Sequence, residues 1–433
     1  MFFLLPIIAF VFFFLVFSTS RKREWRSSLL LSALIWALFL AAVTEFLSLF
    51  KLFSFGWLLG SWIVICGGLG LIYYRLLKKK YLGVPRKPFN ELSRFTNQDF
   101  LLSKIQVRVW VAGIFSIILI VGMIALIAPP NTNDSMGYHM PRVMHWIQNH
   151  SVAHFPTNYT AQLFLSPWSA FAISHFQILS GSDRYANLIQ WFAMIGSIIG
   201  VSLIAKQLGA NLYGQAFAAV FCATIPMGIL QGSSTQNDYV VAFWLVCLVY
   251  YILLSLQNQE KKGYYWQIGL SLGLATFSKP TAYLYAFPFL LWFFVEKVRL
   301  LRWQMLKPIY QIGILAILIN SFHWGRNLEL FHHPLGKSPD YIVYTNRAFS
   351  IPLFLSNIIK NISLHLSTPS PSINRILINF LSFIHEILGV DISDPRTSSS
   401  AFQLNSLINQ EDLAANTIHL FLISIAIICL GAN

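Results

Sequence analysis

The sequence predicts an all-α, polytopic transmembrane protein with about ten or eleven spanning helices, because uncharged runs repeatedly reach the roughly 20 residues that a bilayer-spanning helix needs. Of the 433 residues, 56% are hydrophobic and only 11% are charged. A soluble domain carries about 25% charged residues. A chain this apolar cannot hide its hydrophobic surface in a water-soluble core, so the composition excludes a soluble enzyme.

Basic residues outnumber acidic ones, which gives a formal net charge of +14. In a membrane protein, lysine and arginine concentrate in cytoplasmic loops. We therefore attribute this charge to membrane topology and expect no nucleic-acid partner. The four cysteines all lie inside apolar runs and are expected to be packed free thiols: Cys66, Cys222, Cys247 and Cys429.

The first 77 residues predict a three-helix N-terminal extension, with helices near 2–19, 28–50 and 53–74. The first run lacks the basic start and the cleavage site of a signal peptide, so we interpret it as a retained helix that begins outside. Residues 78–108 are basic and polar and predict a cytoplasmic linker.

The next run, 109–128, predicts a helix that crosses outward and delivers a polar stretch, 131–142, to the outer surface. This stretch contains Asp134. A short amphipathic helix near 138–149 is expected to lie in the membrane interface. Its apolar residues recur at helical spacing: Met140, Val143, Met144 and Ile147.

The apolar segment 163–180 decides the topology of everything after it. If it spans, the basic cluster of 297–307 lies outside. If it is re-entrant or interfacial, that cluster lies inside, as the positive-inside rule favours. We adopt the second alternative.

The remaining runs then predict helices that alternate in direction and complete a transmembrane core over 109–327. They lie near 185–205, 213–231, 239–256, 264–278, 281–295 and 308–323. This topology places Asp134, Asp238, Lys279 and Arg326 on one side of the membrane.

The last hundred residues differ in composition. Residues 328–416 are polar, contain no spanning run, and predict an extracytoplasmic, membrane-associated segment. Amphipathic pieces are expected near 351–366 and 374–389. Residues 417–433 predict the start of a further transmembrane helix, and the chain is expected to be truncated or a fragment of a longer protein.

Each ionisable candidate allows two interpretations. Asp134 is either a solvated loop residue or a functional carboxylate at the helix exit, and Asp238 is either a helix cap or a site residue. Lys279 and Arg326 either snorkel at helix ends or bind a phosphate. His323, His332 and His333 match no strong metal-binding spacing and are expected to be interfacial.

The order of several short motifs carries a family resemblance over roughly residues 109–340. After the first loop and its interfacial helix come a proline-containing apolar stretch, a helix that ends in Lys206-Gln-Leu-Gly209, and a second aspartate, Asp238, that opens a helix. The motifs Ser278-Lys-Pro280, Trp324-Gly-Arg-Asn327 and His333-Pro-Leu-Gly336 follow. This order resembles the GT-C superfamily of membrane glycosyltransferases. It is most similar to the family 39-like group, which includes protein O-mannosyltransferases and the bacterial lipid A aminoarabinose transferase.

The resemblance implies roles for individual residues. Asp134 matches the catalytic aspartate of the first outer loop, beside which lie three candidate substrate-binding residues: Tyr138, His139 and Arg142. Four others match substrate-binding positions: Asp238, Lys279, Arg326 and Asn327.

Two departures from the family pattern concern metal binding. Ser135 stands where many relatives have Glu, and Phe164-Leu-Ser-Pro167 stands where the aminoarabinose type has Glu-Lys-Pro-Pro. No metal ligand is therefore assigned and no cofactor is certain, although a divalent metal remains open.

The expected function is transfer of a sugar from a polyprenyl-phosphate donor to a lipid, glycan or protein acceptor. Asp134 would act as general base in an inverting displacement at an extracytoplasmic site, and Lys279 or Arg326 would hold the phosphate. A multi-pass protein of the bacterial inner or plasma membrane is expected. The alternatives are a transporter or flippase of a lipid-linked sugar, and an inactive homologue.

Overall fold

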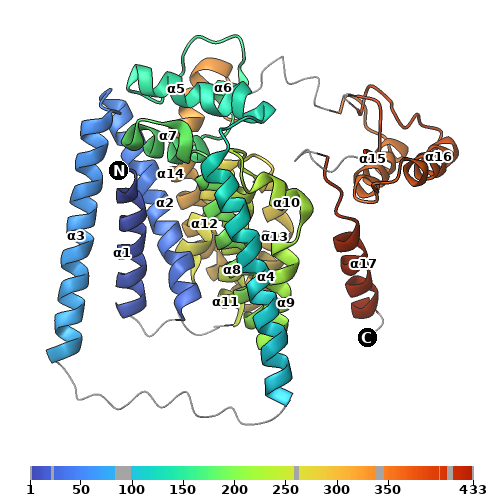
Figure 1. Cartoon of the computed structure of the whole chain (residues 1–433). Helices are drawn as coiled ribbons and strands as arrows, with labels where there is room; N and C mark the ends of the chain where they lie inside the picture. The colour runs from blue at the N-terminus through green and yellow to red at the C-terminus, as the bar shows by residue number, and fades with distance from the viewer. Residues whose placement is uncertain are drawn as a thin grey trace. The chain divides into compact units, whose positions relative to one another are not determined.

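The computed structural model describes residues 2–20, 24–82, 99–257, 263–336, 346–398, 400–406 and 413–431. These residues form helices and no strand, which confirms the all-α prediction (Figure 1). The chain divides into two compact units. The first contains Met1–Ala223 and Gly232–Gly336, and the second contains Thr224–Gln231 and Lys337–Asn433.

Six helical stretches in the described residues are long and apolar enough to cross a membrane: Trp25–Leu49, Phe55–Lys79, Ile105–Ile127, Asp183–Gln207, Asp238–Gln257 and Ala282–Phe331. The sequence predicted about ten or eleven. The counts differ partly because the 50-residue stretch Ala282–Phe331 contains two successive helices. In addition, helices such as α1 (Leu4–Ser20) fall below the 18-residue limit. The protein is a multi-pass membrane protein.

The N-terminal extension consists of α1 with α2 (Trp25–Leu49) and α3 (Phe55–Leu82). Helix α1 packs against both of the others. The basic triplet 21–23 and much of the predicted linker lie outside the described residues. Helix α4 (Asp99–Ile127) starts ten residues before the predicted 109, so the linker is shorter than expected.

Helices α8 (Leu188–Gln207) and α11 (Asp238–Gln257) pack side by side and run in the same direction. Two successive close contacts show this, since Gly196 faces the Phe243 ring and Gly200 faces Val246. The chain must therefore return across the unit between them, and α9 (Leu212–Ala223) is on this return path.

Helices α12 (Tyr265–Ser278) and α14 (Leu306–Phe331) are also parallel, with α13 (Ala282–Leu301) between them in the chain. A Cβ added to Gly269 would lie 3.1 Å from the Ile312 backbone, and one added to Gly273 would lie 3.1 Å from the Ala316 Cα. Small residues let two membrane helices approach this closely. We call the end of the first unit at which α4, α12 and α14 finish the site end.

The segment 163–180 does not cross the unit. It contains α6 (Ala161–Phe164) and α7 (Trp168–Ser180). Before α7, Ser166 Oγ donates to the Thr276 carbonyl near the end of α12, at 2.9 Å. After α7, Asn187 Nδ2 donates to the Ala128 carbonyl beyond α4, at 3.0 Å. Both flanks of α7 therefore lie at the site end, which agrees with the re-entrant alternative.

The extension holds α7 in place through a buried histidine. Trp62 Nε1 of α3 donates to His175 Nδ1 at 3.0 Å, so His175 Nε2 carries the proton and donates to Thr44 Oγ1 of α2, at 2.8 Å. Thr44 in turn donates to the Leu40 carbonyl. Burial lowers the pKa of His175 to about 3, so this chain of hydrogen bonds stays neutral at physiological pH.

The prediction of one helix over 213–231 is wrong. Helix α9 ends at Ala223, and a separate helix α10 (Pro226–Gln231) follows and is assigned to the second unit. Pro226 explains the break, because proline lacks the backbone N–H and its ring clashes with the carbonyl four residues earlier.

The second unit also contains α15 (Ile351–Leu364), α16 (Pro371–Leu388) and α17 (Thr417–Gly431). Helices α15 and α16 occupy the positions predicted for amphipathic pieces, and each exposes large apolar residues such as Phe354 and Phe380. Helix α17 exposes apolar side chains along its length, which is typical of contact with lipid.

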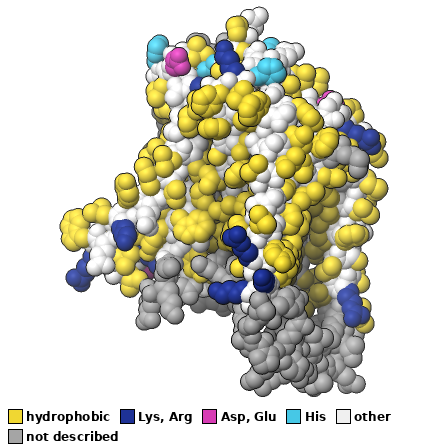
Figure 2. Space-filling model, turned by 90° about the vertical axis from the view of Figure 1, so that its left-hand side faces the viewer, with side chains coloured by type: hydrophobic (Ala, Val, Ile, Leu, Met, Phe, Trp, Pro, Cys, Tyr) yellow, Lys and Arg dark blue, Asp and Glu magenta, His cyan; other side chains and the backbone are white. Residues whose placement is uncertain are grey.

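The flanks of the first unit are apolar as well. Figure 2 shows hydrophobic side chains over most of the face seen there. Val64 on α3 is 74% exposed and Phe115 on α4 is 63% exposed. Such surfaces are expected where lipid chains replace water around a helix bundle.

Candidate functional site

The polar stretch 131–142 folds into two consecutive helical segments at the site end. A π-helical segment η1 (Ser135–His139) follows Asp134, and α5 (Met140–Asn149) continues from it. The short amphipathic helix predicted near 138–149 is therefore confirmed. The Asp134 side chain is partly exposed, and its Oδ2 accepts a hydrogen bond from the Tyr138 hydroxyl at 3.2 Å. A carboxylate in this position is both oriented and accessible.

Ser135, which stands where many relatives have Glu, is fully buried. Its hydroxyl contacts the Thr132 hydroxyl at 2.7 Å and accepts from the Thr235 hydroxyl at 2.6 Å. Thr235 belongs to the loop before α11, so Ser135 joins that loop to the residue next to Asp134. The side chain connects two parts of the site.

His139 and Arg142 are completely enclosed, yet they have unused hydrogen-bonding atoms. Arg142 Nη1 donates to the Leu165 carbonyl at 2.8 Å, whereas its Nε and Nη2 and both ring nitrogens of His139 are buried without a partner. The guanidinium lies over the rings of Tyr138 and Trp146, 5.8 and 5.4 Å from their centroids. Buried hydrogen-bonding atoms without protein partners are costly, so these atoms are available to pair with a ligand or with water.

Asp238 and Lys279 form an ion pair next to these residues. Lys279 Nζ lies 2.6 Å from Asp238 Oδ1, and their side chains are 29% and 37% exposed, respectively. Asn237 Nδ2 donates to the Ser278 carbonyl at 2.8 Å, which ties the start of α11 to the end of α12. Asp238 is thus more than a helix cap, and Lys279 does not simply extend toward water.

Electrostatic effects connect these groups into one set. Burial, followed by the negative charges of Asp134 and Asp238, raises the pKa of Tyr138. Burial and then the positive charges of Arg142 and Lys279 hold the pKa of His139 well below its usual value. We call the set the Asp134 cluster; its members are Asp134, Tyr138, His139, Arg142, Asp238 and Lys279.

Arg326 has a different partner. Its Nη1 and Nη2 bind the two carboxylate oxygens of Glu45 on α2, at 2.7 and 2.8 Å. Glu45 was not among the residues predicted from the sequence. The signal that could have found it is an isolated carboxylate inside the apolar run 28–50, because ionisable residues within membrane helices are functional candidates.

Asn327 is also bound to the protein. Its Nδ2 donates to the carbonyls of Phe164 and Pro334, and its Oδ1 accepts from His154 Nε2 at 3.2 Å. Burial, followed by the charge of Arg326, lowers the pKa of His154 to about 4. Buried His323 adjoins this set, since its Nε2 lies 3.3 Å from Asn327 Nδ2. We call this second set the Arg326 cluster, with the members Glu45, His154, His323, Arg326 and Asn327.

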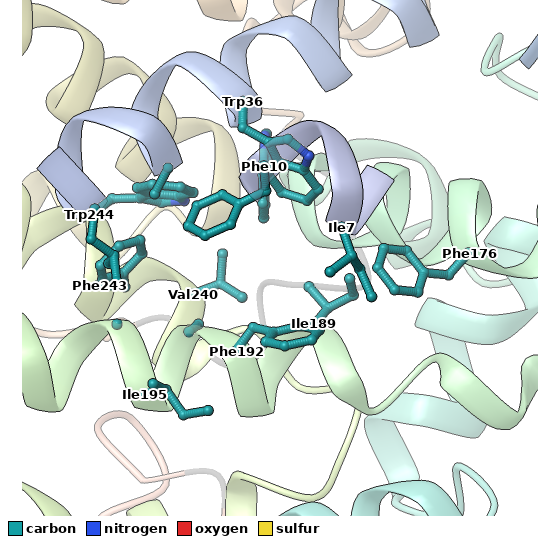
Figure 3. A pocket seen from close by; sticks show the side chains of 15 residues that line it. Ile7, Phe10, Trp36, Phe176, Ile189, Phe192, Ile195, Val240, Phe243 and Trp244 are labelled. Atoms are coloured by element: carbon teal, nitrogen blue, oxygen red, sulfur yellow. The ribbon is translucent and has the colours of Figure 1, made fainter. Parts of the chain in front are cut away.

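An apolar cavity of about 170 Å³ lies within the first unit. Figure 3 shows aromatic and aliphatic side chains from α1, α2, α8 and α11 pointing into it, among them Phe10, Trp36 and Trp244. Trp168 at the start of α7 lines it too. Leu165, whose carbonyl binds Arg142, lies only three residues earlier in the chain. The segment 165–168 therefore contributes both to the Asp134 cluster and to the lining of the cavity.

The residues that the structure describes contain no group of three His, Cys, Asp or Glu side chains placed to hold a metal ion. The four cysteines are free thiols. Of the predicted site residues, six belong to the Asp134 cluster, and the other two, Arg326 and Asn327, belong to the Arg326 cluster.

Comparison with known proteins points to one family. Residues 165–324 match the family model described as dolichyl-phosphate-mannose-protein mannosyltransferase. No curated protein and no solved structure gives a significant match. The matched segment includes Asp238 and Lys279 and ends two residues before Arg326. The match supports a membrane glycosyltransferase of the GT-C type, in agreement with the resemblance seen in the sequence.

Proposed function

We propose that this protein transfers a sugar from a polyprenyl-phosphate donor to an acceptor hydroxyl on the extracytoplasmic side of the membrane. The observation that carries the proposal is the convergence of the Asp134 cluster at one end of the first unit. The cluster combines an accessible carboxylate with a buried guanidinium, Arg142, and a buried imidazole, His139, both of which have hydrogen-bonding atoms without protein partners. A displacement of phosphate by a hydroxyl needs both kinds of group.

Asp134 is the proposed general base. Its carboxylate would take the proton from the acceptor hydroxyl as that oxygen attacks the anomeric carbon and the phosphate leaves from the opposite face. Such a single displacement inverts the configuration at that carbon. The hydrogen bond from Tyr138 to Oδ2 holds the carboxylate in place, and Oδ1 is the proposed proton acceptor.

The phosphate is assigned to Arg142, His139 and Lys279. Arg142 contributes two buried nitrogens, Nε and Nη2, that have no protein partner, and burial lowers its pKa only to about 10, so it is charged at neutral pH. Lys279 lies close enough to affect the titration of His139. Arg326 is less suited to this role than the sequence suggested, because both of its terminal nitrogens bind Glu45.

The apolar cavity next to α7 supports a donor with a hydrocarbon chain. Its lining is almost entirely apolar. A cavity of this kind stays free of water and accepts hydrocarbon groups. We assign to it part of the donor tail, with the phosphate at the Asp134 cluster.

The test is a transfer assay with the purified full-length protein in detergent. Radiolabelled polyprenyl-phosphate mannose is the first donor, because mannose is named in the description of the matched family. Replacing Asp134 with Asn should lower turnover by roughly 10²–10⁴-fold, the usual contribution of general base catalysis.

Asp183→Asn is the matched control, since Asp183 is an exposed carboxylate of the short helix η2 (Asp183–Tyr185) and should not affect turnover. Near-normal transfer by Asp134→Asn would overturn the assignment of the base. Movement of the labelled lipid across a vesicle membrane without any sugar transfer would instead establish a flippase.

A further inference from the structure

Helix α2 of the N-terminal extension contacts the site through polar residues near its end. Glu45 holds both terminal nitrogens of Arg326. One turn later, the Ser48 hydroxyl contacts the Ser151 hydroxyl at 3.0 Å and accepts from the Val152 backbone N–H at 2.9 Å. The same helix thus binds α14 and the loop that follows α5.

Both contacts of α2 lead to residues that adjoin Asn327. The loop fixed by Ser48 leads directly to His154, whose Nε2 donates to Asn327 Oδ1 at 3.2 Å. Asn327 is the residue next to Arg326. Helix α2 therefore holds the Arg326 cluster from two directions, through Glu45 on one side and through the loop of His154 on the other.

The ion pair of Glu45 with Arg326 is sheltered from water. The side chain of Glu45 is 9% exposed and that of Arg326 is 17% exposed. Both guanidinium nitrogens are used at 2.7 and 2.8 Å, which is the two-pronged geometry that gives an arginine–carboxylate pair its orientation. Removing one member would leave the other as an uncompensated charge in a nearly dry place.

Glu45 lies far outside the residues that match the family, 165–324. We infer that Glu45 is a positioning residue for the transfer reaction. It fixes the Arg326 guanidinium and the neighbouring Asn327, whose Nδ2 donates to the Phe164 carbonyl of α6. The next carbonyl in the chain, that of Leu165, binds Arg142 of the Asp134 cluster. The N-terminal extension then completes the site and is more than a membrane anchor. This inference rests on the proposed glycosyl transfer.

The test compares Glu45→Gln with Glu24→Gln in the full chain. Glu24 is the matched control, because it too is an extension carboxylate that binds a cation in the matched segment, Lys206, at 2.8 Å. Glu45→Gln should lower kcat by roughly 10²-fold, the cost of a small misplacement at a reacting centre, with a smaller change in KM. Glu24→Gln should leave both constants unchanged.

A charge-reversed double variant, Glu45→Arg with Arg326→Glu, separates positioning from simple stability. It should recover the thermal stability that is lost in Glu45→Arg alone and in Arg326→Glu alone. It should not recover transfer, because the guanidinium then belongs to α2 and no longer lies next to Asn327 on α14. Recovery of both would show that the pair is only structural and would overturn the inference.

Native mass spectrometry measures the binding of polyprenyl phosphate without any turnover. The result identifies which of the two proposals has failed. If the unmodified protein neither transfers sugar nor retains this lipid, the proposed function is wrong. If it does both and Glu45→Gln is equally active, only the role of Glu45 is wrong.

Discussion

The two ends of the first unit carry charged groups in contrasting surroundings. At the end opposite the site, Glu24 binds Arg26 and Lys206, whose side chains are 14% and 50% exposed, and all three guanidinium nitrogens of Arg26 have protein partners. At the site end, Arg142 is fully buried and Arg326 is 17% exposed. Exposed pairs contribute little to stability, whereas buried charges are tolerated only with partners or for a function.

The contrast separates two uses of charge in one membrane protein. The sequence predicts that the Glu24 group lies on the cytoplasmic side, where basic residues serve topology under the positive-inside rule. The site end gathers charges of both signs from α2, α5, α12 and α14, and some of their hydrogen-bonding atoms are unused. Comparing changes at the two ends therefore distinguishes catalytic residues from residues that only set orientation.

The largest difference is expected from replacing arginine with lysine at each end. Arg142→Lys keeps the charge but removes the buried Nε–H and one further N–H, so turnover should fall by roughly 10²-fold or more, as when an oxyanion donor is lost. Arg26→Lys should change turnover little, although Arg26 also donates to Ser202 and Gln215 at 3.0 Å. Kinetics on the two purified variants check this, and equal losses would remove the distinction between the ends.

A smaller effect concerns stability at acid pH. The folded pKa of His175 is about 3, below the unfolded value near 6.5, so its contribution is complete above pH 6.5 and is lost as the pH falls toward 3. At pH 5.0 the loss in the free energy of unfolding amounts to about 2 kcal/mol. Thermal unfolding in detergent at pH 7.5 and 5.0 should show a smaller acid loss in His175→Gln than in the unmodified protein. The same loss in both would contradict the prediction.

The third comparison changes no function and tests only the side of the membrane. Cysteines at 182 and 300 are suited to it, because Ser182 is exposed beyond α7 and Leu300 is 48% exposed at the far end of α13. A membrane-impermeant maleimide should label 182 from the extracytoplasmic side and 300 only after permeabilisation. The reverse pattern would place the site in the cytoplasm.

Much of the fold could be predicted from the sequence because apolar run length determines where membrane helices form. The predicted helix over 239–256 differs from α11 by one residue at each end. The basic loops also favoured the re-entrant alternative for 163–180. The break before Pro226 was missed, although proline inside a helix gives the physical reason for it.

The site was harder to predict, because a sequence shows which polar residues share a membrane side but not which of them touch. Asp238 and Lys279 were both proposed, yet nothing in the sequence indicated that they bind each other. Arg326 was expected beside the phosphate because its partner Glu45, 281 positions away, was not considered. Such long-range pairs depend on helix packing, and helix packing is not encoded in any local pattern.

The hydrogen bonds of α7 have a consequence for biogenesis. The partners of His175 come from α2 and α3, which leave the ribosome well before α7 is made. Helix α7 has 13 residues, about 20 Å at 1.5 Å per residue, too short to insert as an independent spanning segment. We expect α2 and α3 to insert into the membrane first and to present their hydrogen-bonding groups to α7, so that the order of synthesis guides α7 to its place.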